Sequence, residues 1–118
     1  MNEKVTVLIL YAMLLALSLP AEAQQAGKVP RIGYVSPTGG PKTPGPAVEG
    51  FQQGLRDFGY IEGKNIVVEY RYVEGKFDRN PSLVAELMQL KVEVLVVPGP
   101  GGIRAAKQAT KTVPIVIV

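Results

Sequence analysis

The sequence predicts an α/β domain built on a doubly wound parallel sheet, and two observations carry this prediction. Strand-like and helix-like segments alternate strictly from residue 28 to residue 118. Each pair of successive strands is separated by one amphipathic helical segment, which is the pattern of parallel strands joined by right-handed crossovers. The expected strands span residues 31–35, 66–72, 94–97 and 115–118.

The four expected strands differ in polarity, and this difference predicts their order in the sheet. Residues 66–72 place Glu69 and Arg71 on one face, which suits an edge strand with one solvent-exposed face. Residues 94–97 and 115–118 are wholly apolar and therefore favour the interior. The order 2-1-3-4 satisfies both patterns, but it leaves the fourth strand as an exposed apolar edge. We therefore expect further strands and helices beyond this partial lobe.

Three helices are expected between the strands. The first begins at Pro46 or Ala47 and ends before Gly59, a residue suited to a left-handed C-cap. The second begins with Asn80 as N-cap and Pro81 in the first helical position. The third spans residues 103–110 and is rich in alanine. The predicted buried stripes are Val48, Phe51, Leu55 and Phe58 in the first helix, and Leu83, Val84, Leu87 and Leu90 in the second.

Residues 1–23 have the features of a secretory signal peptide. Lys4 supplies positive charge, residues 5–19 are apolar except for two hydroxyl residues, and Ala21-Glu22-Ala23 is an A-x-A-like cleavage site. The apolar run is shorter than the ~20 residues of a membrane-spanning helix, although an uncleaved anchor is the alternative interpretation. We expect cleavage after Ala23, a lobe formed by residues 24–118, and a periplasmic or extracellular location.

The composition excludes several functions. The chain has no Cys and no His, so it lacks disulfides, thiolate metal sites and the commonest general base. Its net charge of +3 is spread over single residues rather than a basic stripe, which gives no support for nucleic-acid binding. We expect no catalytic set, no metal and no cofactor.

Two loops at the carboxyl ends of the expected strands form the predicted binding site. In open α/β sheets, ligands bind where the strand order reverses, here between the first and third strands. The long loop 36–46 brings hydroxyl groups and flexible backbone to this point, and the loop 98–102 leads into a helix whose N–H groups suit a carboxylate. The predicted ligand-binding residues are Ser36, Thr38, Gly39, Gly99, Gly101 and Gly102.

Several segments together resemble the ABC transporter substrate-binding proteins of the tryptophan/tyrosine type. The matching segments, in order, are Gly50-Phe51-Gln52-Gln53-Gly54-Leu55-Arg56-Asp57-Phe58-Gly59-Tyr60-Ile61-Glu62-Gly63-Lys64-Asn65-Ile66, Glu69-Tyr70-Arg71-Tyr72, Glu74-Gly75-Lys76-Phe77-Asp78-Arg79, Ala85-Glu86-Leu87, Ala105-Ala106-Lys107-Gln108-Ala109-Thr110 and Val113-Pro114-Ile115-Val116. The resemblance implies a type I periplasmic binding protein fold, with two lobes closing on a small solute such as an amino acid. It also implies an ABC permease in the inner membrane as partner.

The family pattern and this chain differ at one turn. Relatives commonly carry a Gly-Thr-Pro-like turn after the third strand, where this chain has Gly99-Pro100-Gly101. Pro100 has no hydroxyl group, so any ligand contact that the Thr makes in relatives is missing here. The chain would supply the N-terminal part of the first lobe, without the hinge or the second lobe.

Other interpretations are weaker. The stretch from Gly99 to Arg104 resembles a dinucleotide fingerprint, but its last glycine is replaced by Arg104 and it follows the third strand. Glu69, Glu74 and Asp78 are expected as solvated charges, and Tyr34 is the aromatic residue best placed to stack on a solute. Two alternatives to a working binding protein stay open, namely a truncated remnant without function and a flavodoxin-like or Rossmann-like enzyme domain.

Overall fold

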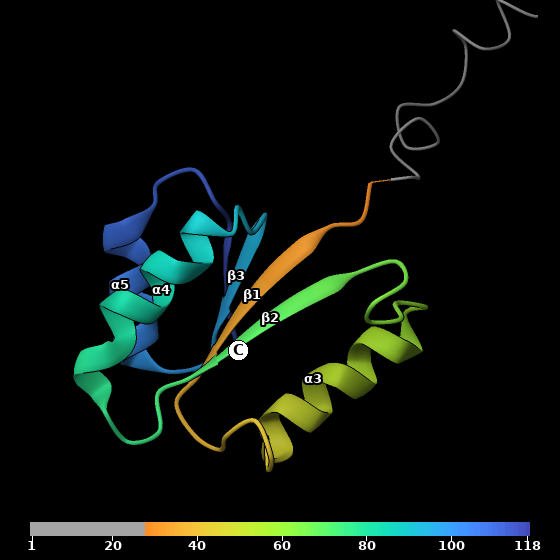
Figure 1. Ribbon diagram of the computed structural model, residues 1–118, viewed down its shortest axis with the longest axis horizontal. Coiled ribbons are helices and arrows are strands. Elements are labelled where there is room, and N and C mark those ends of the chain that lie inside the picture. Colours follow the sequence, from red (N-terminus) through yellow and green to blue (C-terminus); the bar gives the residue numbers. More distant parts are fainter. Residues whose placement is uncertain (1–27) are drawn as a thin grey trace, which may run out of the picture.

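The computed structural model describes residues 28–118, so the predicted signal peptide lies outside the described residues. These residues form four strands, three α-helices and one 3₁₀ turn in the predicted alternation (Figure 1). The elements in chain order are β1 (Arg31–Ser36), α3 (Pro46–Asp57), β2 (Val67–Tyr72), η1 (Phe77–Arg79), α4 (Asn80–Gln89), β3 (Val94–Val97), α5 (Pro100–Ala109) and β4 (Ile115–Ile117).

The four strands form one parallel sheet in the order β2-β1-β3-β4, which confirms the predicted order. β1 lies at the centre, where Ile32 pairs with Val68 on one side and with Val94 on the other. β3 continues the sheet, and Val96 pairs with Val116 of β4. The strand order therefore reverses between β1 and β3, the position at which this class of fold binds ligands.

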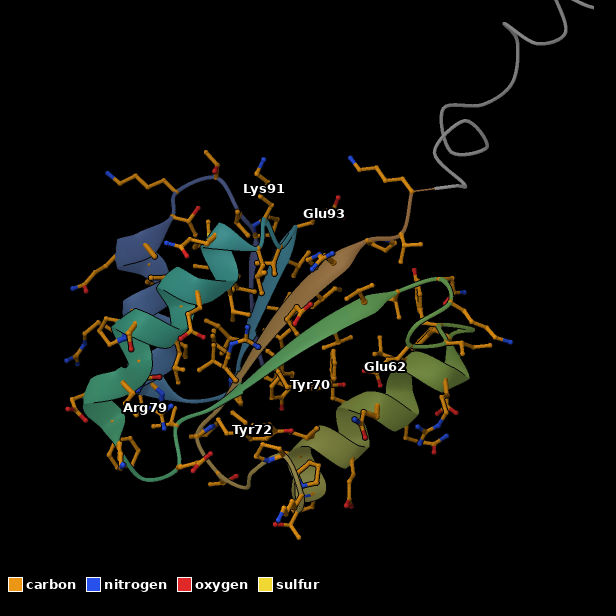
Figure 2. The ribbon with its side chains drawn as sticks, viewed as in Figure 1. Glu62, Tyr70, Tyr72, Arg79, Lys91 and Glu93 are labelled. Carbon is orange, nitrogen blue, oxygen red and sulfur yellow. The ribbon has the colours of Figure 1, made fainter. Side chains whose placement is uncertain are left out.

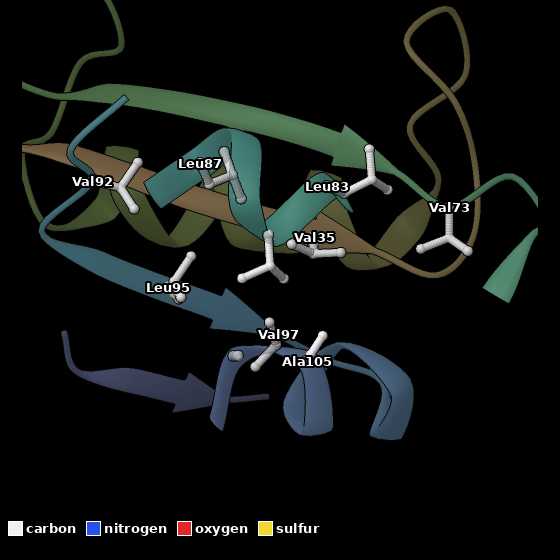
Figure 3. Packing of buried hydrophobic residues seen from close by; sticks show 10 residues of the cluster. Val35, Val73, Leu83, Leu87, Val92, Leu95, Val97 and Ala105 are labelled. Atoms are coloured by element: carbon white, nitrogen blue, oxygen red, sulfur yellow. The ribbon is translucent and has the colours of Figure 1, made fainter. Parts of the chain in front are cut away.

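The helices cover both faces of the sheet unequally. α4 and α5 lie together on one face, and α3 lies alone on the other (Figure 1). The larger core lies under α4 and α5, where Leu83 and Leu87 of α4 pack on the apolar side chains of β1 and β3 (Figure 3). The smaller core lies under α3 and contains Tyr34, Val48 and Val96. Layers on both faces are what a parallel sheet needs, because its strands must be shielded from water on each side.

A glycine in β1 allows α4 to approach the sheet closely. A Cβ atom on Gly33 would lie 2.9 Å from Cδ1 of Leu87 and 3.1 Å from Cδ2 of Leu95. Both atoms are the ends of buried side chains, so a larger residue at position 33 would force Leu87 and Leu95 to shift within a packed core. Gly33 therefore leaves room for Leu87 of α4 to lie against the strand that ends at the candidate site.

Some predicted details of the helices are wrong. α5 begins at Pro100 rather than at residue 103, because Gly99 adopts an extended conformation and proline suits the first helical turn. Asn80 lies within α4 and makes no side-chain cap, so it is not the predicted N-cap. Phe58 and Leu90 were expected in buried stripes but are 85% and 37% exposed, because each lies at the end of its helix, beyond the part that packs on the sheet.

None of the helices in residues 28–118 is both long enough and apolar enough to cross a membrane. The three helices of residues 28–118 all pack on the sheet.

Candidate functional site

A small hollow lies where the strand order reverses. β1 ends at Ser36 and β3 ends at Val97, and these neighbouring strand ends open toward the same edge of the sheet. The hollow has a volume of about 60 Å³, several times the roughly 10–15 Å³ that a cavity needs to hold one water molecule. It is lined by Val35, Pro37, Phe77, Asn80 and residues 99–102.

Two helices begin at this edge and direct their N-termini toward it. α4 starts at Asn80 and α5 starts at Pro100, and neither helix has an acidic residue in its first turn. The first N–H groups of a helix lack acceptors within the helix, and the helix dipole makes this end partly positive. In α5 these N–H groups belong to Gly101 and Gly102, since Pro100 has none. The edge therefore offers hydrogen-bond donors to a solute oxygen.

Asn80 joins the two helix starts. Its side chain is almost completely buried, with 5% of the residue exposed, and its Nδ2 donates to the backbone oxygen of Phe77 at 2.9 Å. This bond ties the 3₁₀ turn η1 to the start of α4. The same amide lies against α5, because a Cβ on Gly101 would be 2.9 Å from Nδ2 and a Cβ on Gly102 would be 3.5 Å from Oδ1. The glycines at these positions leave the space that the amide occupies.

A second hollow of about 290 Å³ continues outward between α4 and α5. Phe77, Asn80 and Gly101 line both hollows, so the two meet around the Asn80 side chain. The outer hollow also has charged side chains, Asp78 and Arg104. A solute at this edge therefore meets a neutral inner space and a charged outer one.

The structure places the six predicted site residues in two groups. Gly99, Gly101 and Gly102 line the inner hollow, whereas Ser36, Thr38 and Gly39 do not. The Ser36 hydroxyl is buried and donates to the backbone oxygen of Thr38 at 2.7 Å, so it is engaged within its own loop.

The loop after β1 turns back on itself and keeps Gly39 away from the hollow. Gly40 N donates to the backbone oxygen of Thr43 at 3.0 Å, and Gly39 has a left-handed φ of 74°. A Cβ on Gly39 would lie 2.1 Å from the backbone oxygen of Pro44, so this turn requires glycine. From this loop, Pro37 is the residue that reaches the hollow, and it packs against Gly99.

Sequence reasoning missed Pro37, Phe77 and Asn80 at the site. The Asn80-Pro81 pair marked a helix start, and a helix start that follows a strand in a parallel sheet lies at the carboxyl edge, where ligands bind. That signal was sufficient to place Asn80 near the site. Phe77 of η1 lines the same hollow as the start of α5 because of tertiary packing, which no local sequence pattern indicates.

The other candidate groups lie away from the two hollows. Tyr34, which was expected to be the best stacking residue, is 1% exposed beneath α3 and packs on Phe51 with ring centroids 4.9 Å apart, so the prediction that it can stack on a solute is wrong. Glu69 is paired with Arg31 at 3.1 Å and with Arg71 at 3.8 Å. Within residues 28–118, no group of three or more Asp and Glu side chains is arranged to hold a metal ion.

A solved structure shares this fold. The chain is similar to the ligand-free, open structure of CD0873, a substrate binding protein with adhesive properties from Clostridium difficile, with a TM-score of 0.63 and 22% identity. The match covers 75% of this chain and 30% of CD0873, so the chain spans less than a third of that protein's length. No protein-family model and no curated protein matches the sequence. At this identity the similarity establishes the fold.

Proposed function

We propose that the chain forms part of the first lobe of a solute-binding protein that serves a bacterial ABC importer. The observation that carries the proposal is the hollow between the ends of β1 and β3, at which α4 and α5 both begin. Ligands bind at this position in open α/β sheets. The similarity in fold to a substrate binding protein supports the same role.

In the proposed mechanism, this lobe supplies one half of the binding surface and a second lobe closes over the solute. The N–H groups in the first turn of α5 hold an oxygen of the solute, and the apolar walls of the hollow exclude water from that contact. No proton transfer is involved, so the residues bind and orient the solute without changing it. The solute proposed is a small polar molecule, with amino acids as the class to be tested first.

The proposal includes export of the protein. Residues 1–23 direct the chain out of the cytoplasm and are removed after Ala23, which leaves the lobe in the periplasm or outside the cell. The liganded protein then docks on a permease in the inner membrane.

The test is thermal unfolding of the 118-residue chain with a panel of amino acids and other small solutes. A solute with a Kd of 1 mM, added at about 10 mM, should stabilise the fold by about 1.4 kcal/mol and raise Tm by several degrees. Gly101→Ala should abolish this shift, because its Cβ displaces the Asn80 amide. Gly54→Ala is the control and should keep the shift, since a Cβ there meets open space.

The same panel can contradict the proposal. If no solute raises Tm at this concentration, the edge of the sheet does not bind small solutes in this chain. A shift of equal size in wild type and in Gly101→Ala would place binding elsewhere on the molecule.

A further inference from the structure

The inner hollow has a neutral lining. Of its eight lining residues, Asn80 is the one with a polar side chain, and the others are glycine, proline, valine and phenylalanine. Among residues 28–118, no charged side chain lines this hollow, whereas Asp78 and Arg104 line the outer one. Burial of a charged group without a partner of opposite charge is costly, so the inner hollow favours an uncharged group.

Asn80 has hydrogen-bonding capacity left for a solute. Its Nδ2 uses one hydrogen for Phe77, and its Oδ1 accepts no hydrogen bond from residues 28–118. No buried side-chain oxygen or nitrogen in this part of the chain lacks a partner, so Oδ1 must be reached by solvent. Because the residue is 95% buried and lines both hollows, this solvent contact lies within them. An acceptor held in this way suits an O–H or N–H group of a solute.

The first turn of α5 supplies the complementary donors. Gly101 and Gly102 line the same hollow, and their N–H groups have no acceptor within the helix. A group that enters the hollow therefore meets donors from the α5 backbone and an acceptor from Asn80. A hydroxyl or a carboxamide has both a donor and an acceptor and satisfies this arrangement. A carboxylate accepts from the backbone donors and from the second hydrogen of Asn80 Nδ2, but it offers no donor to Oδ1, whose lone pairs repel its charge.

We infer that Asn80 is a specificity-determining residue, which selects solutes that present a small uncharged hydroxyl or carboxamide group to the inner hollow. The inference rests on the proposed function and narrows its solute class. A solute donor binds Oδ1 of Asn80, and the solute oxygen accepts from the first turn of α5. The hollow of about 60 Å³ limits this group to a few non-hydrogen atoms.

The experiment compares matched solutes with the 118-residue chain. The pairs are glutamine with glutamate, asparagine with aspartate, and serine with alanine, and each Kd is measured by calorimetric titration. In the pair that binds, the neutral polar member should bind about 2- to 10-fold more tightly, the ratio expected from one net hydrogen bond. In Asn80→Leu this ratio should fall to about 1, because leucine keeps the size of the side chain and removes both polar atoms.

A merely structural role for Asn80 gives a different result. If the substitution only changed the shape of the hollow, it would weaken the binding of both solutes of a pair equally. The ratio of their Kd values would then stay at its wild-type value. Asn80→Ser is the second variant, since its hydroxyl oxygen replaces the amide oxygen as an acceptor and should retain part of the preference even if Asn80→Leu fails to fold. The thermal unfolding of both variants identifies any loss of fold.

Three outcomes would overturn the inference, and two of them leave the proposed function standing. An unchanged ratio in a folded Asn80 variant, or tighter binding of the charged or apolar member by wild type, would remove Asn80 as the selecting residue while solute binding stands. Absence of binding by every solute, including those of the wider panel, would overturn the proposed function and this inference together.

Discussion

At the scale of single residues, three tyrosines of β1 and β2 lie close together beneath α3. Tyr34 and Tyr70 have ring centroids 5.8 Å apart, and Tyr70 and Tyr72 stack at 6.5 Å. The Tyr70 hydroxyl donates to Glu62 Oε1 at 2.9 Å and accepts from Gln52 Nε2 at 3.3 Å, so it links β2 to α3 and to the loop between them (Figure 2). Burial is the main cause that raises the pKa of all three phenols above 10.

The raised pKa of Tyr70 predicts a loss of stability in alkali. The unfolded chain ionises this phenol near pH 10, whereas the folded chain keeps it protonated. The stabilisation is therefore complete below pH 10 and declines as the pH rises from there toward the folded pKa. Urea unfolding between about pH 8 and pH 11 should show the free energy of unfolding falling less steeply in Tyr70→Phe than in wild type. Equal slopes would contradict the prediction, and Tyr60→Phe, at a 42% exposed site, is the control.

At the scale of elements, α4 connects the core to the site. Leu83, Val84 and Leu87 pack on the sheet, and the helix ends at Gln89. The chain then turns from α4 toward β3 through Lys91, which has a left-handed φ of 58°. Because the turn begins there, Leu90 no longer faces the core although it continues the helical spacing. The opposite end of α4 carries Asn80, so the packing of this helix also holds the site in place.

Two alanine substitutions test the difference in burial between the Leu87 and Leu90 side chains. Leu87 is fully buried, and Leu87→Ala should lower the free energy of unfolding by about 2–5 kcal/mol through lost burial and a cavity. Leu90→Ala removes the same atoms from a 37% exposed side chain and should cost well under half as much. Denaturant unfolding of both variants measures the difference. Equal losses would mean that the end of α4 is packed more closely than the structure shows.

At the scale of the whole molecule, the two edges of the sheet differ. β2 has Glu69 and Arg71 on one face, where Arg71 also pairs with Glu86 of α4 at 2.8 Å. β4 has no charged residue, and Val116 and Ile117 are 47% and 59% exposed. Charges on an edge strand discourage pairing with other chains, and an apolar edge invites it. We therefore expect association through β4 rather than through β2.

A charge on β4 should reduce this association. Residues 24–118 expressed alone are expected to be poorly soluble, and Ile117→Lys in this segment should increase the concentration at which it stays monomeric, measured by sedimentation. Tm should change little, because this side chain is exposed. Thr112→Lys adds the same charge at an exposed position before the strand and is the control. A soluble monomeric wild type with a sharp cooperative melt would contradict the expectation.

The sequence by itself determined the layout of the described residues. Strict alternation of short apolar strands with amphipathic helices gave the parallel α/β class, and the charged face of residues 66–72 placed that strand at an edge. These features are local, because the periodicity of a helix or a strand depends on residues that are close in the sequence. The carboxyl edge of β1 and β3 followed from the strand order, so the region of the candidate site was also predictable, including Gly99, Gly101 and Gly102.

The tertiary structure decided which side chains face that region. Ser36 has the right position in the sequence, but its hydroxyl is engaged with Thr38, and Tyr34 is covered by α3. Asn80 follows the second strand by eight residues, yet it lies against Gly101 because α4 and α5 pack side by side. Such contacts join residues distant in the chain, and their distances depend on how closely the helices pack on the sheet. The spacing of residues in a sequence indicates which face of a helix or strand a side chain lies on. Which other residue that side chain contacts depends on how the helices and strands pack together.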